Sequence, residues 1–123
     1  MFDNIAELAQ MIVDGEVPGF TITSSGRLVT SGFAVGGNPE CAELRLSKVS
    51  ECPVAMVEQT LDHYTRVARM YGQSVVGGWV FEGDLYLDAP TIYRDGEEAE
   101  RIARERGEKA YFDLDTLTEH FVS

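Results

Sequence analysis

A single apolar stripe in the middle of the chain constrains the fold more than any other feature. Within residues 53–71, apolar side chains recur at intervals of three and four, the period of one face of an α-helix. Pro53 suits the first helical position, and Gly72 is typical of a helix end. The pattern predicts one long helix that buries this stripe against another element. The stripe consists of Val54, Val57, Leu61, Tyr64, Ala68 and Tyr71.

Alternating apolar and polar residues predict strands before this helix. Residues 19–49 are rich in β-branched and aromatic side chains, and turn residues interrupt them at 24–26 and 36–39. Strands that follow one another in sequence usually pair. We therefore expect a three-stranded antiparallel meander in this part of the chain.

A second apolar segment, residues 74–93, predicts a β-hairpin after the helix. Gly83 and Asp84 are residue types typical of a two-residue hairpin turn. Within the first strand, Gly77 and Gly78 favour either a bulge or the close approach of another backbone. The sequence leaves both alternatives open.

Capping residues predict shorter helices towards both ends of the chain. Residues 4–14 have helical spacing, with Asn4 as the N-cap, and Asp95 caps a second helix that ends at Gly107. A short strand is expected at 110–112. Asp115 then predicts a terminal helix that carries Leu117 and Phe121.

Together these elements predict a single α+β domain that spans residues 1–123. We expect a mostly antiparallel, twisted sheet made of the meander and the hairpin. The main helix packs on one face of the sheet, and the short helices are peripheral. Residues 85–113 are compatible with a short βαβ crossover.

Net charge narrows the possible partners. The chain has 21 acidic and 10 basic residues in 123, a formal charge of −11. This balance disfavours direct binding to nucleic acid, which draws on Lys and Arg, and to anionic membranes. The N-terminal segment contains no base before Arg27, and no apolar run is long enough to span a membrane. We expect a cytoplasmic protein with no cofactor and a basic protein surface as its partner.

The last third of the chain has a characteristic order of landmarks. These are Tyr86-Leu87-Asp88, then Asp95-Gly96-Glu97-Glu98-Ala99, then the segment 106–114. In this order they resemble a module found at the end of small uncharacterised proteins of actinobacteria and their bacteriophages. The resemblance implies a phage or mobile-element origin and no catalytic residues.

Few residues suggest catalysis. His63 beside Asp62 could be a general base, but a surface histidine is the simpler interpretation. Asp113 and Asp115 could hold a divalent cation, but capping and strand-end roles explain them better. Cysteine-rich metal spacing is absent from the sequence, and we interpret both cysteines, Cys41 and Cys52, as small core residues. We expect no metal and no enzyme.

The acidic residues cluster in four segments without a base: 3–16, 51–62, 82–88 and 113–119. If these segments merge into a negative face, the face could imitate nucleic acid and occupy a basic groove. We therefore predict a small inhibitor or adaptor that engages a nucleic-acid-binding partner, most concretely an anti-CRISPR protein. The predicted contacts are Glu58, Asp62, Glu82, Asp84, Asp88 and Trp79.

Two alternatives belong to other classes. The chain could be a structural protein that forms homo-oligomers through the hairpin around Trp79. It could also be a small metal-dependent hydrolase that uses His63 or the pair Asp113 and Asp115.

Overall fold

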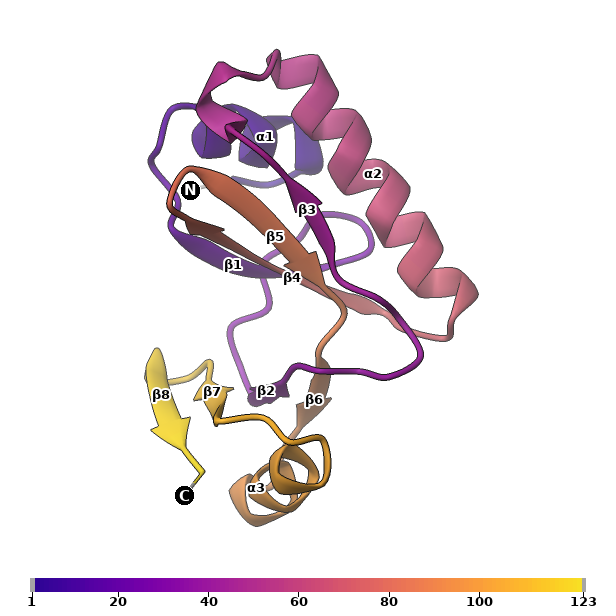
Figure 1. Cartoon of the computed structure of the whole chain (residues 1–123), viewed down its shortest axis with the longest axis vertical. Coiled ribbons are helices and arrows are strands. Elements are labelled where there is room, and N and C mark those ends of the chain that lie inside the picture. The colour runs from indigo at the N-terminus through magenta and orange to yellow at the C-terminus, as the bar shows by residue number, and fades with distance from the viewer. Residues whose placement is uncertain (1, 123) are drawn as a thin grey trace.

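The computed structural model describes residues 2–122 as an α+β domain, which confirms the predicted fold class. Within these residues, three α-helices and a 3₁₀ turn accompany eight strands in two sheets, and every strand pairing is antiparallel (Figure 1). The helices are α1 (Ile5–Val13), α2 (Val54–Met70) and α3 (Gly96–Glu105), and the 3₁₀ turn is η1 (Val49–Glu51). The strands are β1 (Gly19–Thr23), β2 (Phe33–Val35), β3 (Leu44–Leu46), β4 (Val75–Phe81), β5 (Asp84–Asp88), β6 (Thr91–Tyr93), β7 (Ala110–Asp113) and β8 (Thr118–Phe121).

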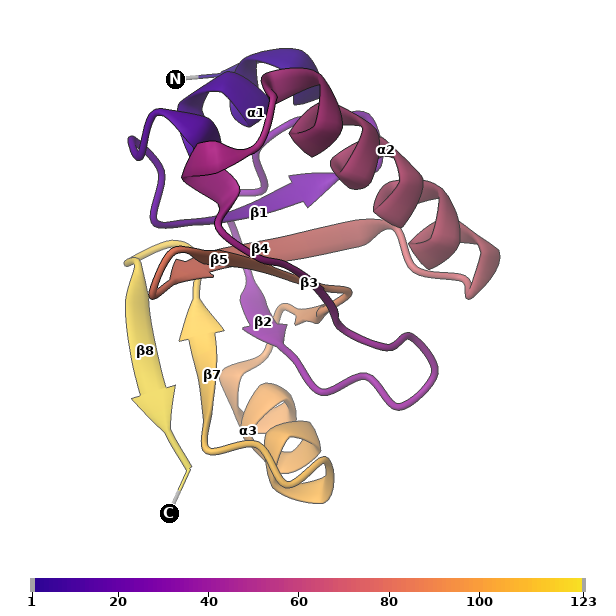
Figure 2. The ribbon, with the colours of Figure 1, turned by 45° about the horizontal axis from the view of Figure 1, so that its top comes forward.

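The larger core lies between the first sheet and two helices. Strands β1-β4-β5-β3 form this sheet, and α1 and α2 cover one of its faces (Figure 2). Most of the predicted stripe faces the sheet, since Val57, Leu61, Tyr64 and Ala68 are buried. At its two ends the prediction is wrong: Pro53 is the N-cap of α2, and Tyr71 lies past the last helical residue and is 53% exposed. No helix of residues 2–122 has the length and apolarity that crossing a bilayer requires.

The second sheet has the order β6-β2-β7-β8 and packs α3 on one face. Strands β6 and β7 both run antiparallel to β2, which lies between them, so they run in the same direction. Helix α3 connects them, and β6-α3-β7 is therefore a crossover unit with a strand inserted between its two strands. A small core around Val35, Ala99 and Ala103 holds α3 in place. Figure 2 shows α1 and α2 on one side of the first sheet, and the second sheet with α3 on the other side.

The predicted meander of residues 19–49 does not form. Strand β1 pairs with β4, β3 pairs with β5, and β2 belongs to the second sheet. In the part of the chain that the structure describes, an isolated antiparallel bridge joins Ile22 to Leu28, and no second strand forms there. The apolar hairpin β4-β5 offers two long edges for β1 and β3, and these distant pairings replace the local ones.

The hairpin turn lies one residue earlier than predicted. Glu82 and Gly83 both have positive φ and form the two-residue turn, whereas Asp84 begins β5. The strand register passes through Gly77 and Gly78 without an extra residue, so no bulge forms. Side chains, and not another backbone, approach these glycines: Asp88 at Gly77 and the ring of Phe20 at Gly78.

The predicted terminal helix is wrong. Asp113 Oδ1 accepts the backbone N–H groups of Asp115 and Thr116 at 3.0 and 3.3 Å, which stabilises a turn. Leu117 has a φ of 57°, and β8 follows and pairs with β7. A helix of this length would be marginal without a face to bury. Pairing with β7 satisfies the same backbone groups within the sheet.

Candidate functional site

The face of the first sheet that points away from α1 and α2 carries a different set of side chains. The strand register aligns Thr21, Gly77 and Asp88 in one row across β1, β4 and β5. Continued by one residue, the register of β3 places Glu43 beside Asp88. Because side chains alternate between faces of a sheet, this row lies opposite the core.

The second sheet supplies the facing wall. Its register aligns Ala34, Phe112 and Glu119 in a row across β2, β7 and β8. Tyr111 belongs to the other face, where it stacks on His120 at 5.2 Å between ring centroids and helps to pack α3. The two sheets therefore turn one row each towards the space between them.

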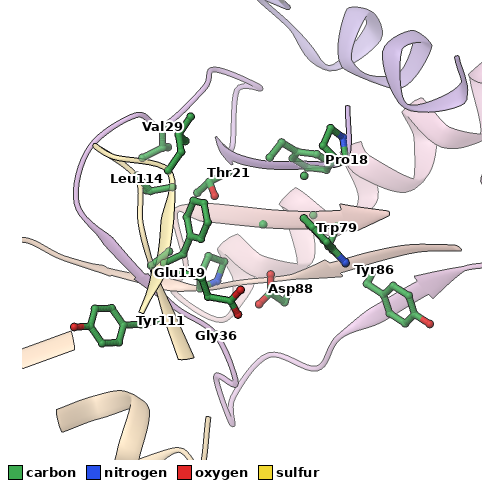
Figure 3. A pocket seen from close by; sticks show the side chains of 18 of the residues that line it. Pro18, Thr21, Val29, Gly36, Trp79, Tyr86, Asp88, Tyr111, Leu114 and Glu119 are labelled. Atoms are coloured by element: carbon green, nitrogen blue, oxygen red, sulfur yellow. The ribbon is translucent and has the colours of Figure 1, made fainter. Parts of the chain in front are cut away.

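An open cleft of about 780 Å³ occupies this space, with Asp88 pointing into it (Figure 3). Apolar and aromatic side chains and several glycines form most of its lining. Among the described lining residues, those that carry a charge are Glu43, Asp88 and Glu119, and all three are acidic. The cleft is thus an apolar groove with negative charge on both walls.

Two glycines leave room for the carboxylates. A Cβ on Gly77 would lie 2.6 Å from Asp88 Oδ1, which is shorter than real contacts of this kind. A Cβ on Gly36 would lie 3.0 Å from Asp88 Oδ2 and also 3.0 Å from Glu108 Oε1. The carboxylates of Asp88 and Glu108 therefore approach one another over the bare backbone of Gly36.

The electrostatic setting of Asp88 is unfavourable for its charge. Burial, with the like charges of Glu43 and Glu108, raises the pKa of Asp88 from 3.8 to about 6. A hydrogen bond from its own backbone N–H opposes this shift in part. At neutral pH the cleft therefore holds an ionised carboxylate whose charged neighbours repel it.

Aromatic residues occupy the same face of the first sheet as Asp88. Trp79 pairs with Gly19 on one side and Tyr86 on the other, and its ring lies over Gly19, 2.8 Å from the point that a Cβ on that residue would occupy. The side chain of Trp79 is 54% exposed. On the next strand, the guanidinium of Arg45 sits 5.5 Å from the ring centre of Tyr86. This face of the sheet already holds a cation against an aromatic ring.

The structure gives Asp84 a structural role. Arg45 Nε donates to Asp84 Oδ2 at 2.9 Å, and the Lys48 backbone N–H donates to Oδ1 at 3.0 Å. These hydrogen bonds lower the pKa of Asp84. Its charge is compensated within the chain, so it is less available to a partner than that of Asp88.

The predicted contacts are not all brought together. Asp88 and Trp79 line the cleft, and Glu82 lies exposed in the β4–β5 turn. Glu58 and Asp62 lie on α2, on the opposite side of the first sheet, where Asp62 pairs with Arg66. The acidic residues therefore form separate regions on two sides of this sheet.

The candidate catalytic residues do not enter the cleft. His63 is exposed on α2. Asp115 Oδ2 accepts the Gly32 backbone N–H at 3.1 Å, and Asp113 supports the turn before β8. Among residues 2–122, no group of three or more His, Cys, Asp and Glu side chains is placed to hold a metal ion. Both cysteines are free thiols.

Sequence reasoning missed three acidic residues around Asp88: Glu43, Glu108 and Glu119. The sequence could have indicated Glu43, because apolar and polar residues alternate over 42–47 and Glu43 falls on the polar face of this strand. Glu119 was assigned to a helix that does not form, and Glu108 reaches Gly36 only through the crossover. No local pattern brings these segments together.

In comparisons with known proteins, no family model, curated protein or solved structure matches the chain.

Proposed function

We propose that this chain is a non-enzymatic binding protein that engages a basic surface of a partner protein through the cleft between its two sheets. The observation that carries the proposal is the charge of the cleft, in which the charged lining residues Glu43, Asp88 and Glu119 are all acidic. A basic partner would supply the cation that Asp88 lacks among the charges acting on it.

The energetics favour such a partner. The ionised form of Asp88 is destabilised by Glu43 and Glu108, and an incoming positive charge would relieve this repulsion. Apolar walls lower the local dielectric constant and so strengthen a charge pair formed between them. The net charge of −11 accelerates the approach of a basic partner from a distance.

A nucleic-acid-binding protein is the partner that best fits this charge, because its own binding groove is basic. An inhibitor of such a protein, including an anti-CRISPR protein, is the specific form of the proposal. In this form the cleft face, and not α2, makes the contact. Occupying the basic groove would displace nucleic acid from it.

A fluorescent nona-arginine peptide tests the proposal. Any chain this acidic attracts a polycation, so the test compares two variants with the same net charge. Asp88→Asn removes a charge in the cleft, and Glu58→Gln removes one from exposed α2.

We expect the affinity of the wild-type chain for the peptide to fall as the NaCl concentration rises from about 0.05 M to about 0.5 M. We expect Asp88→Asn to weaken binding at least about fivefold and Glu58→Gln less than about twofold. Equal effects of the two variants would refute a role for the cleft.

Exposed aromatic side chains favour self-association as a second candidate. Trp79 and Phe81 are 54% and 52% exposed on the cleft side of β4. Exposed apolar residues of this size are typical of interfaces. Sedimentation velocity of the wild type and of Phe81→Ser across a concentration series distinguishes the candidates. A monomer at every concentration would exclude self-association.

A further inference from the structure

The cleft has the features of a pocket for one cationic side chain. Its floor carries Asp88, and the opposing row contributes Glu119. Trp79 on the neighbouring strand β4 and Tyr86 on the same strand as Asp88 line the same cleft. A cleft that holds aromatic rings and a carboxylate with no basic residue among the charges acting on it suits an organic cation.

The combination favours a guanidinium over an ammonium group. A guanidinium is planar, stacks on aromatic rings, and is more weakly hydrated than an ammonium, so it loses less on entering an apolar groove. It also presents parallel N–H donors that match the two oxygens of a carboxylate. Within the chain, the guanidinium of Arg45 lies over the Tyr86 ring while it pairs with Asp84, which is the same combination of contacts.

The glycines define where the group would bind. Asp88 Oδ1 packs against Gly77 and Oδ2 against Gly36, where Glu108 also reaches, so a bound group would approach Asp88 from the side that faces the cleft (Figure 3). Glu43 lies on the neighbouring strand. A cation placed against Asp88 would therefore interact favourably with two further carboxylates. Within residues 2–122 the carboxylates do not form a metal-binding group, which leaves an organic cation as the better match.

We infer that the cleft is a recognition pocket for a single arginine side chain of the partner protein, held by Asp88 and stacked on Trp79. The inference rests on the proposed function and assigns the chemistry of its central contact. In this arrangement, Glu43 and Glu108 add long-range attraction, and the apolar walls accept the aliphatic part of the arginine.

The chain contains one tryptophan, so the intrinsic fluorescence of Trp79 reports directly on the pocket. The probes are three short capped peptides that differ only at the central residue, which is arginine, lysine or citrulline. Citrulline keeps the shape of arginine and lacks its charge. We expect a saturable change in emission with the arginine peptide. We expect affinity to be at least tenfold weaker for citrulline and severalfold weaker for lysine.

Variants of the chain complete the test. Asp88→Asn should reduce affinity for the arginine peptide at least tenfold, whereas the matched Glu58→Gln variant should bind normally. Circular dichroism and thermal unfolding verify that both variants are folded. Equal binding of arginine and citrulline peptides, or unchanged binding by folded Asp88→Asn, would overturn the inference.

The two proposals can fail separately. If nona-arginine binding depends on Asp88 but the single-arginine peptide produces no response, the proposed function stands and the arginine pocket is rejected. If the single-arginine peptide binds at Asp88 but nona-arginine binding is indifferent to Asp88→Asn, the pocket stands and the proposed mode of partner binding is rejected.

Discussion

The ring of Phe20 lies directly across Gly78 on the neighbouring strand. A Cβ at position 78 would fall 2.0 Å from Phe20 Cζ and 2.4 Å from Cε1. The two residues are register partners on β1 and β4, and Phe20 is 8% exposed. Glycine at this position therefore lets an aromatic ring close one end of the core between the first sheet and its helices.

Gly78→Ala should destabilise the protein by about 2–3 kcal/mol, because the Phe20 ring must move out of a packed core. Equilibrium urea unfolding measures this change. Gly96→Ala is the control, since its Cβ would lie 3.3 Å from Phe33 at the start of a helix. In a Phe20→Leu background the cost of Gly78→Ala should shrink. If Gly78→Ala lowered the free energy of unfolding no more than Gly96→Ala does, the result would contradict this account.

Asp84→Asn should lower the melting temperature at neutral pH. The substitution weakens the pairing with Arg45 and leaves an amide in place of a carboxylate that accepts the Lys48 backbone N–H. Because the pKa of Asp84 is lowered in the folded state, its stabilisation is complete above the ordinary value of 3.8. It is lost as the pH falls below that value. Thermal unfolding at neutral and acidic pH should show the two proteins converging in acid.

Asp88→Asn, in contrast to Asp84→Asn, should stabilise the folded protein at neutral pH. The folded-state pKa of Asp88 is raised to about 6, so its ionisation destabilises the folded state as the pH rises from 3.8 through 6. The neutral amide removes this cost, and the variant should gain roughly 1–2 kcal/mol at pH 7.5, allowing for partial exposure to solvent. The gain should vanish near pH 4. Urea unfolding at both pH values tests it, with Glu58→Gln expected to show no such gain.

The proposed binding should weaken in acid, because a cation requires ionised Asp88. With a pKa of about 6, lowering the pH from 7.5 to 5 should reduce affinity for the arginine peptide about tenfold. Glu43, Glu108 and Glu119 also face the cleft or act on Asp88, so the variant Asp88→Asn is needed to separate the contribution of Asp88 from theirs. Titration of Asp88→Asn over the same range should give a nearly flat profile. An equally steep profile for this variant would assign the effect to another group.

Local sequence patterns correctly predicted the helices whose caps and apolar spacing are clear in the sequence. The stripe of α2 as far as Ala68 and the caps of α1 and α3 correspond to the structure, because each depends on residues within one or two helical turns. The Asn4 side chain accepts the Glu7 N–H, and the Asp95 side chain accepts that of Glu97. The pattern at Asp115 resembles such a cap, but Asp115 instead binds Gly32, which lies far away in sequence.

The sequence by itself determined the fold class, the main helix with its buried face, and the presence of Asp88 and Trp79 on an apolar hairpin. The tertiary structure decided the division into two sheets and the cleft between them. Pairing partners such as β2 with β7 are separated by most of the chain, and local propensity carries no information about which distant edges meet. The negative lining of the cleft arises only when Glu43, Asp88 and Glu119 are brought to facing walls by those pairings.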